Sequence, residues 1–165
     1  MKKLLALVMA LMMLLCSAAV AEEIVYEEFF DGTWVQFEEG FELYLPSDWL
    51  VLESTEEELE AGIAFSVCSP DEAYYMALMW QGLEVELTIE ELQVALVEAG
   101  YPVEPLEVNN IALLVMGDAE NDTLSFIGMD AAEPGYYTFL FTPMSDENLQ
   151  TLAAVIASSL RNIEE

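Results

Sequence analysis

The sequence predicts an α+β protein in which two helices pack against a mostly antiparallel sheet. Short apolar segments, several of them alternating with polar residues, follow one another between residues 33 and 142. Turns rich in Gly, Pro, Asn and Asp separate these segments, as expected for strands. Two other segments, 89–99 and 145–161, carry apolar residues at helical spacing instead. Because the connections between segments are short, we expect the strands to form an antiparallel meander.

The first half of the chain is predicted to consist mainly of strands. In the segment 41–45, Phe41, Leu43 and Leu45 alternate with other residues, which indicates one buried face. In the segment 73–80 both alternating faces are apolar, as in a strand that is covered on both sides. The predicted strands are 33–37, 41–45, 49–52, 62–69 and 73–80, and the acidic segment 54–60 is predicted to be a surface loop or a helical turn.

The second half is predicted to contain two helices with four strands between them. Thr88 and Glu91 form a capping-box pattern at the start of a predicted helix at 89–99, and Gly100 ends that helix. Ser145 is predicted to cap a last helix, with Arg161 as its final residue, because a base at the end of a helix suits its dipole. Between the helices we predict strands at 103–108, 111–117, 123–129 and 135–142.

The N-terminus has the three parts of a secretory signal peptide. Lys2 and Lys3 precede an apolar run at 4–15, and Ala19-Val20-Ala21 matches a cleavage site. The alternatives are an N-terminal core helix and lipidation at Cys16. We therefore predict a signal peptide at 1–21, an acidic lead-in at 22–32, one α+β domain at 33–161, and a secreted, extracytoplasmic bacterial protein.

The charge of the predicted mature chain is extreme. Cleavage leaves Arg161 as the only basic residue against 32 acidic ones, a formal charge of −31. Such a protein repels nucleic acid and anionic membrane surfaces, and favours cationic partners. A surface this acidic also arises for solubility alone. Cys68 would be the only remaining cysteine; we expect a buried, inert thiol, with a reactive or intermolecular one as the alternative.

The sequence lacks most of the side-chain combinations that enzymes use for catalysis. There is no His, so Ser-His-Asp and Cys-His catalysis are excluded, as are zinc sites built from His and Cys. We therefore predict that the protein is not an enzyme. The alternative is a hydrolase that uses a pair of carboxylates on a neutral or cationic substrate such as a glycan. Such an enzyme would need exposed aromatic side chains, whereas Trp34, Trp49 and Trp80 lie in strand-like segments typical of a core.

One acidic turn is a candidate cation site. Asp118, Glu120 and Asp122 stand at alternate positions, as at the start of a calcium loop. Thr123 stands where that loop requires Gly, and Met129 where it requires a bidentate Glu. The alternative is a polar hairpin turn. No cofactor is predicted apart from this possible Ca²⁺.

The segment 41–49 fits the pattern F-x-L-x-L-P-x-x-W, and 152–161 forms a matching C-terminal helix segment. Both resemble PsbP-like (Mog-type) domains, over about residues 33–161. The resemblance implies an α/β/α sandwich around an antiparallel sheet. It extends to small secreted proteins of anaerobic gut-type bacteria whose role is unassigned, and it carries over no catalytic residues.

The sequence thus predicts a secreted, highly acidic, non-catalytic binding or interaction domain. Its expected ligands are cationic: basic peptides or proteins, polyamines, or divalent cations. The protein is expected to be a monomer that binds neither nucleic acid nor, after signal cleavage, membranes.

Overall fold

The computed structural model describes residues 25–37, 40–130 and 133–163. The predicted signal peptide at 1–21 lies outside the described residues. The described part of the chain combines α-helices with antiparallel sheets, which confirms the α+β class. Every predicted strand, and the helix at 89–99, is present to within two residues of its predicted ends. None of the helices in these ranges is long and apolar enough to cross a membrane.

The larger sheet has seven strands in the order β3-β4-β5-β9-β8-β7-β6, and all neighbours are antiparallel. Asn109 and Asn110 join β6 to β7 with φ of 48° and 64°. Two successive positive φ angles define the tight hairpin turn that matches strand twist, and Asn tolerates them well. The strands are β3 (Leu50–Val51), β4 (Ile63–Cys68), β5 (Tyr75–Gly82), β6 (Val103–Val108), β7 (Ile111–Asp118), β8 (Thr123–Met129) and β9 (Gly135–Thr142).

The smaller sheet has the order β1-β2-β10, with β1 at Gly32–Gln36, β2 at Phe41–Pro46 and β10 at Arg161–Asn162. A 3-10 turn, η1 (Tyr26–Glu28), precedes it. Every residue of the central strand β2 is buried. The prediction that Arg161 ends the last helix is wrong, because the chain leaves that helix at Ser159 and pairs with β2 as a strand.

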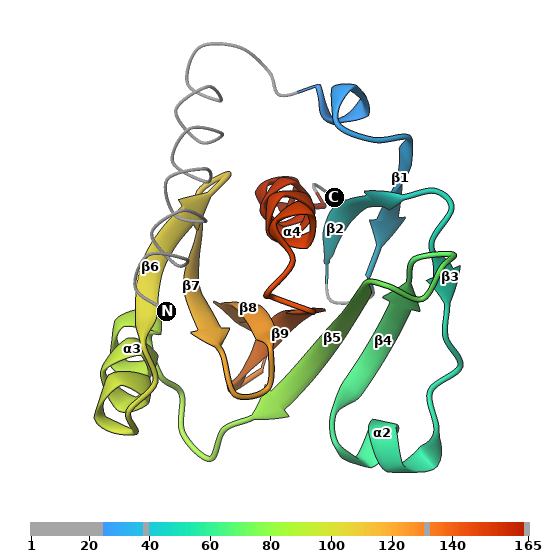
Figure 1. Ribbon diagram of the computed structural model, residues 1–165. Coiled ribbons are helices and arrows are strands. Elements are labelled where there is room, and N and C mark those ends of the chain that lie inside the picture. The colour runs from blue at the N-terminus through green and yellow to red at the C-terminus, as the bar shows by residue number, and fades with distance from the viewer. Residues whose placement is uncertain (1–24, 38–39, 131–132, 164–165) are drawn as a thin grey trace.

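The main core lies between the two sheets, around α4 (Glu147–Ser158). Figure 1 shows the seven-stranded sheet curving around α4, with β2 on the other side of that helix. Alternate strand residues such as Phe126 and Phe141 point to this side and are fully buried. The predicted cap of α4, Ser145, is wrong, because the helix is capped by Asp146. The Asp146 side chain accepts hydrogen bonds from the N–H groups of Asn148 and Leu149.

The opposite face of the large sheet is covered by α3 (Ile89–Glu98). The predicted capping box is present, since Thr88 Oγ1 accepts the Glu91 N–H and the Glu91 carboxylate accepts the Thr88 N–H. Leu92 is the buried residue of α3 and packs on Leu114 and Ile127. This contact covers the β6–β8 side of the face and leaves the rest open.

The acidic segment after β3 forms a short helix, α2 (Glu56–Glu60), which confirms the helical alternative for it. Thr55 and Glu58 make a second capping box there. Carboxylates in a first helical turn are stabilised by the positive end of the helix dipole. The local sequence therefore accounts for α2 without any buried residue, and the described part of α2 has none.

Candidate functional site: a groove on the open sheet face

A groove of about 470 Å³ lies where α3 leaves the sheet uncovered. Leu96 and Tyr101, from the last turn of α3 and the residues after it, line one side, and strands β7, β8, β9 and β5 contribute the floor. A volume of roughly 300–1,000 Å³ is typical of small-ligand sites. The groove is therefore large enough to hold several side chains of a ligand.

Side chains on the floor lie in rows that cross the strands. Strand pairing places Met116 opposite Ser125, which is opposite Leu140. The next row runs through Ile127, Thr138 and Met79. These residues belong to one face because side chains two apart on a strand point the same way. The floor thus mixes apolar side chains with hydroxyl groups.

Asp118 and Asn121 lie at one end of the floor. Asp118 Oδ1 accepts the backbone N–H groups of Glu120 (2.9 Å) and Asn121 (3.2 Å), and its Oδ2 accepts Asn121 Nδ2 (2.7 Å). These hydrogen bonds, led by the one from the Asn121 side chain, lower the pKa of Asp118 below 3.8. Asp118 is therefore a fixed anion at neutral pH.

Tyr136 and Gln81 lie at the other end, paired across β9 and β5. The Tyr136 hydroxyl donates to Gln81 Oε1 over 2.6 Å. Burial raises the pKa of Tyr136 above 10.0, so the phenol stays protonated and remains a donor. This end of the groove is polar and neutral, in contrast to the Asp118 end.

No cationic side chain lines this groove among the described residues. The sequence has three basic residues, and the described one, Arg161, is paired with Glu42 in the small sheet. An anionic ligand would find no counter-charge here, whereas a cationic one would meet Asp118. The charge distribution around the groove is therefore more favourable for a cation than for an anion.

The predicted cation ligands Asp118, Glu120 and Asp122 do not converge. Asp122 faces the start of α4, where its oxygens accept Ser145 N–H (2.7 Å) and Ser145 Oγ–H (2.8 Å). The Asp118 carboxylate closes its own turn instead. Within residues 25–37, 40–130 and 133–163, no three His, Cys, Asp or Glu side chains form a group suited to a metal. The geometry is that of the polar hairpin turn, and Ca²⁺ binding there stays a prediction.

A smaller hollow of about 150 Å³ collects carboxylates: Glu86, Asp130 and Glu133 contribute to its lining. Asp130 Oδ2 already accepts Trp80 Nε1–H and the Tyr137 hydroxyl, each at 3.0 Å. The hydrolase alternative requires paired carboxylates and an aromatic side chain in one cavity. In the described hollows these features are divided, since this one has no aromatic lining and the larger groove has one carboxylate.

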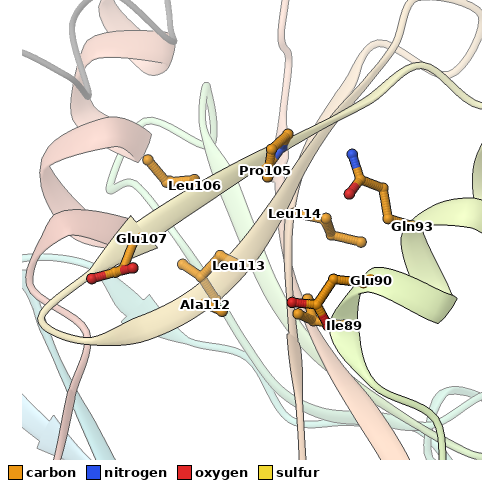
Figure 2. A pocket seen from close by; sticks show the side chains of 9 residues that line it. All are labelled: Ile89, Glu90, Gln93, Pro105, Leu106, Glu107, Ala112, Leu113 and Leu114. Carbon is orange, nitrogen blue, oxygen red and sulfur yellow. The ribbon is translucent and has the colours of Figure 1, made fainter.

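A third hollow, of about 250 Å³, lies between the first turns of α3 and the hairpin of β6 and β7 (Figure 2). Leu114, Ala112 and Pro105 form apolar walls. Figure 2 shows Glu90, from α3, and Glu107, from β6, among the side chains around it. Like the larger groove, it combines apolar side chains with carboxylates and has no cationic side chain in its described lining.

Comparison with known proteins places the fold. No family profile matches the sequence, and no curated protein matches it significantly. Several solved structures are similar in fold. One is the solution structure of cyanobacterial PsbP (CyanoP) from Synechocystis sp. PCC 6803, with 12% identity, a TM-score of 0.56, and coverage of 80% of this chain and 92% of that one.

The second is a crystal structure from Bacteroides thetaiotaomicron VPI-5482, with 13% identity and a TM-score of 0.53. It matches 82% of this chain, which spans half of the length of that protein. At these identities the likeness concerns the fold alone. The chain has a PsbP-like α+β fold, as the segments 41–49 and 152–161 predicted.

Proposed function

We propose that this protein is an exported, non-catalytic binding domain that holds a cationic, amphipathic peptide in the groove beside α3. The observation that carries the proposal is a half-covered sheet face, mixed apolar and hydroxylic, on a protein with 32 acidic and three basic residues. The signal-peptide pattern at 1–21 supports export.

The two parts of the groove have different roles in this proposal. Half-buried side chains on the floor, such as Met79 and Leu140, supply apolar area that a ligand can cover. The surrounding negative field attracts cations and raises their association rate, an effect that falls with salt. A ligand with both apolar and basic side chains uses both properties.

A pair of peptides and a pair of variants test this proposal. A hexapeptide of alternating Lys and Leu is titrated against the protein in parallel with its Glu-Leu counterpart, and binding is measured by calorimetry. Thr138→Trp fills the floor, whereas Val51→Trp adds the same ring to the exposed strand β3. We expect only the Lys-Leu peptide to bind, with at least tenfold loss in Thr138→Trp and no loss in Val51→Trp. Equal binding by both variants, or by both peptides, contradicts the proposal.

Divalent cations are the second class of ligand that the charge favours. If Ca²⁺ binds specifically, it raises the melting temperature more than NaCl at matched ionic strength, because binding to the native state stabilises it beyond screening. Equal shifts would leave screening as the whole effect. The same titration with Asp118→Asn and Asp122→Asn assigns any specific effect to the 118–122 turn.

A further inference from the structure

We infer that Asp118 selects the ligand: it receives one Lys or Arg side chain of a peptide lying extended along the strands, while alternate apolar side chains of that peptide cover the floor. This inference rests on the proposed function and specifies the sequence of the ligand. Three features of the groove lead to this inference: the position of Asp118, the hydrogen-bonding capacity that its carboxylate still has, and the spacing of the rows on the floor.

Asp118 is the only carboxylate among the described residues that line the groove. It lies opposite Thr123 in the β7–β8 pairing, at the end of the floor. Other acids, such as Glu120 in the same turn, contribute to the general field but are not part of the lining. A ligand cation in the groove therefore has one place at which direct pairing is possible.

The Asp118 carboxylate is held in place and still has room for a donor. An ionised carboxylate offers about four lone-pair sites. Two on Oδ1 accept the Glu120 and Asn121 N–H groups, and one on Oδ2 accepts Asn121 Nδ2. One site on Oδ2 remains, which suits an ammonium or guanidinium N–H. Because the carboxylate is already oriented, pairing costs little additional side-chain entropy.

The floor has a repeat that matches an extended chain. The floor has four rows, from Asp118–Thr123 at one end to Tyr136–Gln81 at the other. Successive rows are two residues apart on each strand, or roughly 6.7 Å, so the floor is about 20 Å long. An extended peptide presents side chains to one side at the same interval, whereas a helix repeats every 5.4 Å or so.

The match predicts the order of residues in the ligand. With a basic side chain at the Asp118 row, the next two side chains that face the floor meet the Met116–Leu140 row and the Met79–Thr138 row. Both rows contain apolar side chains. The predicted ligand pattern is therefore basic-x-apolar-x-apolar, because alternate side chains of an extended chain face the same side.

The test compares the peptide Lys-Ser-Leu-Ser-Leu-Ser with one in which Gln replaces Lys. Both are titrated at low salt against the wild type, Asp118→Asn and the matched control Glu120→Gln, which removes the same charge from the same turn. We expect Asp118→Asn to weaken the Lys peptide about tenfold and to leave the weaker Gln peptide unchanged. Glu120→Gln should change neither affinity by more than about twofold. Circular dichroism melts confirm that each variant is folded.

The possible failures are distinguishable. If the Lys peptide binds wild type and Asp118→Asn equally, or if Glu120→Gln weakens it as much as Asp118→Asn does, the role of Asp118 is wrong. In that case the proposed function still stands as long as Thr138→Trp blocks binding. If the Lys and Gln peptides bind the wild-type protein with equal affinity, the inference that the groove selects a basic residue is wrong. This comparison needs no variant. If neither peptide binds and Thr138→Trp has no effect on the Lys-Leu peptide, both proposals are wrong.

Discussion

Arg161 and Glu42 form an ion pair that joins the C-terminal strand to the centre of the small sheet. Arg161 Nε donates to Glu42 Oε1 over 2.6 Å, and the two residues are direct partners in the β10–β2 register. Glu42 is only 8% exposed. The Arg161 guanidinium also covers Trp34, with its Cζ 3.6 Å from the ring centroid. The one basic residue of the described chain thus compensates a nearly buried carboxylate.

Replacing Arg161 with Ala should destabilise the protein by about 1–3 kcal/mol. The Glu42 carboxylate would lose its cation in a position with little water, and the contact with Trp34 would be lost as well. The Arg161 side chain is 50% exposed, so solvent reduces the cost below that of a fully buried pair. Urea unfolding measures the change, and Arg161→Lys should fall between wild type and Ala because it keeps the charge but not the planar group.

The matched control for that experiment is Glu42→Gln, alone and combined with Arg161→Ala. If the pair acts as a unit, the double variant should be more stable than the sum of the two single effects implies. Simple additivity, or no loss of stability in Arg161→Ala, would show that the ion pair contributes little.

The turn between β4 and β5 should make stability depend on pH. Asp71 Oδ1 accepts the Ser69 hydroxyl at 2.7 Å and the Ala73 N–H at 3.2 Å. These bonds, that from Ser69 first, lower the pKa of Asp71 below 3.8. A lowered folded-state pKa adds stability above the unfolded-state value, and this contribution is lost as pH falls through the folded-state pKa.

Asp71→Asn should therefore be less stable than wild type at pH 7, and the difference should close as the pH falls below about 4. Glu72→Gln removes the same charge from the same turn and corrects for the change in self-repulsion of a very acidic protein. Chemical unfolding of all three proteins at several pH values gives the comparison. A gap between wild type and Asp71→Asn that widens towards low pH would be opposite in sign to this expectation.

Cys68 should be unreactive in the native protein. It lies on β4 and is 2% exposed, in agreement with the buried thiol that the sequence predicts. A thiol reagent reaches such a side chain only after local or global opening. We expect negligible modification of Cys68 in native buffer and complete modification in denaturant, with the site assigned by peptide mass. Stoichiometric labelling within minutes under native conditions would mean that β4 opens readily.

Local patterns in the sequence identified the elements well. The Thr88–Glu91 capping box depends on residues close in the chain and is present as predicted. Asn109 and Asn110 likewise form one of the Asn-containing turns expected between the strands. Arg161 shows where local reasoning fails. A base at the end of a helix suits the helix dipole, but its partner Glu42 is 119 residues away, and only the assembled fold brings the two together.

The sequence predicts only part of the groove. The apolar second face of the segment 73–80 predicts a covered strand, whereas Met79 of that face lines an open groove. The strand pattern shows which residues share a face, but the position at which α3 docks decides which of them stay uncovered. The spacing of acidic residues predicts Asp118 as a candidate ligand, but its place at the end of the groove follows from strand register.

The two long helices should differ in local stability. Leu92 is the buried residue of α3, whereas α4 has eight buried residues, five of which belong to the main core. Few buried contacts allow an element to open without global unfolding. We therefore expect amide hydrogen exchange in α3 to be at least tenfold faster than in α4.

Leu92→Ala and Leu149→Ala form the matched pair that tests this difference. Removing Leu92 should cost about 2–3 kcal/mol and increase exchange mainly in α3, whereas removing Leu149 should cost about 3–5 kcal/mol and affect the whole core. Because the end of α3 forms one side of the groove, a bound Lys-Leu peptide should slow exchange in α3 more than in α4. Equal protection of both helices in the free protein would indicate that α3 is anchored by more than Leu92.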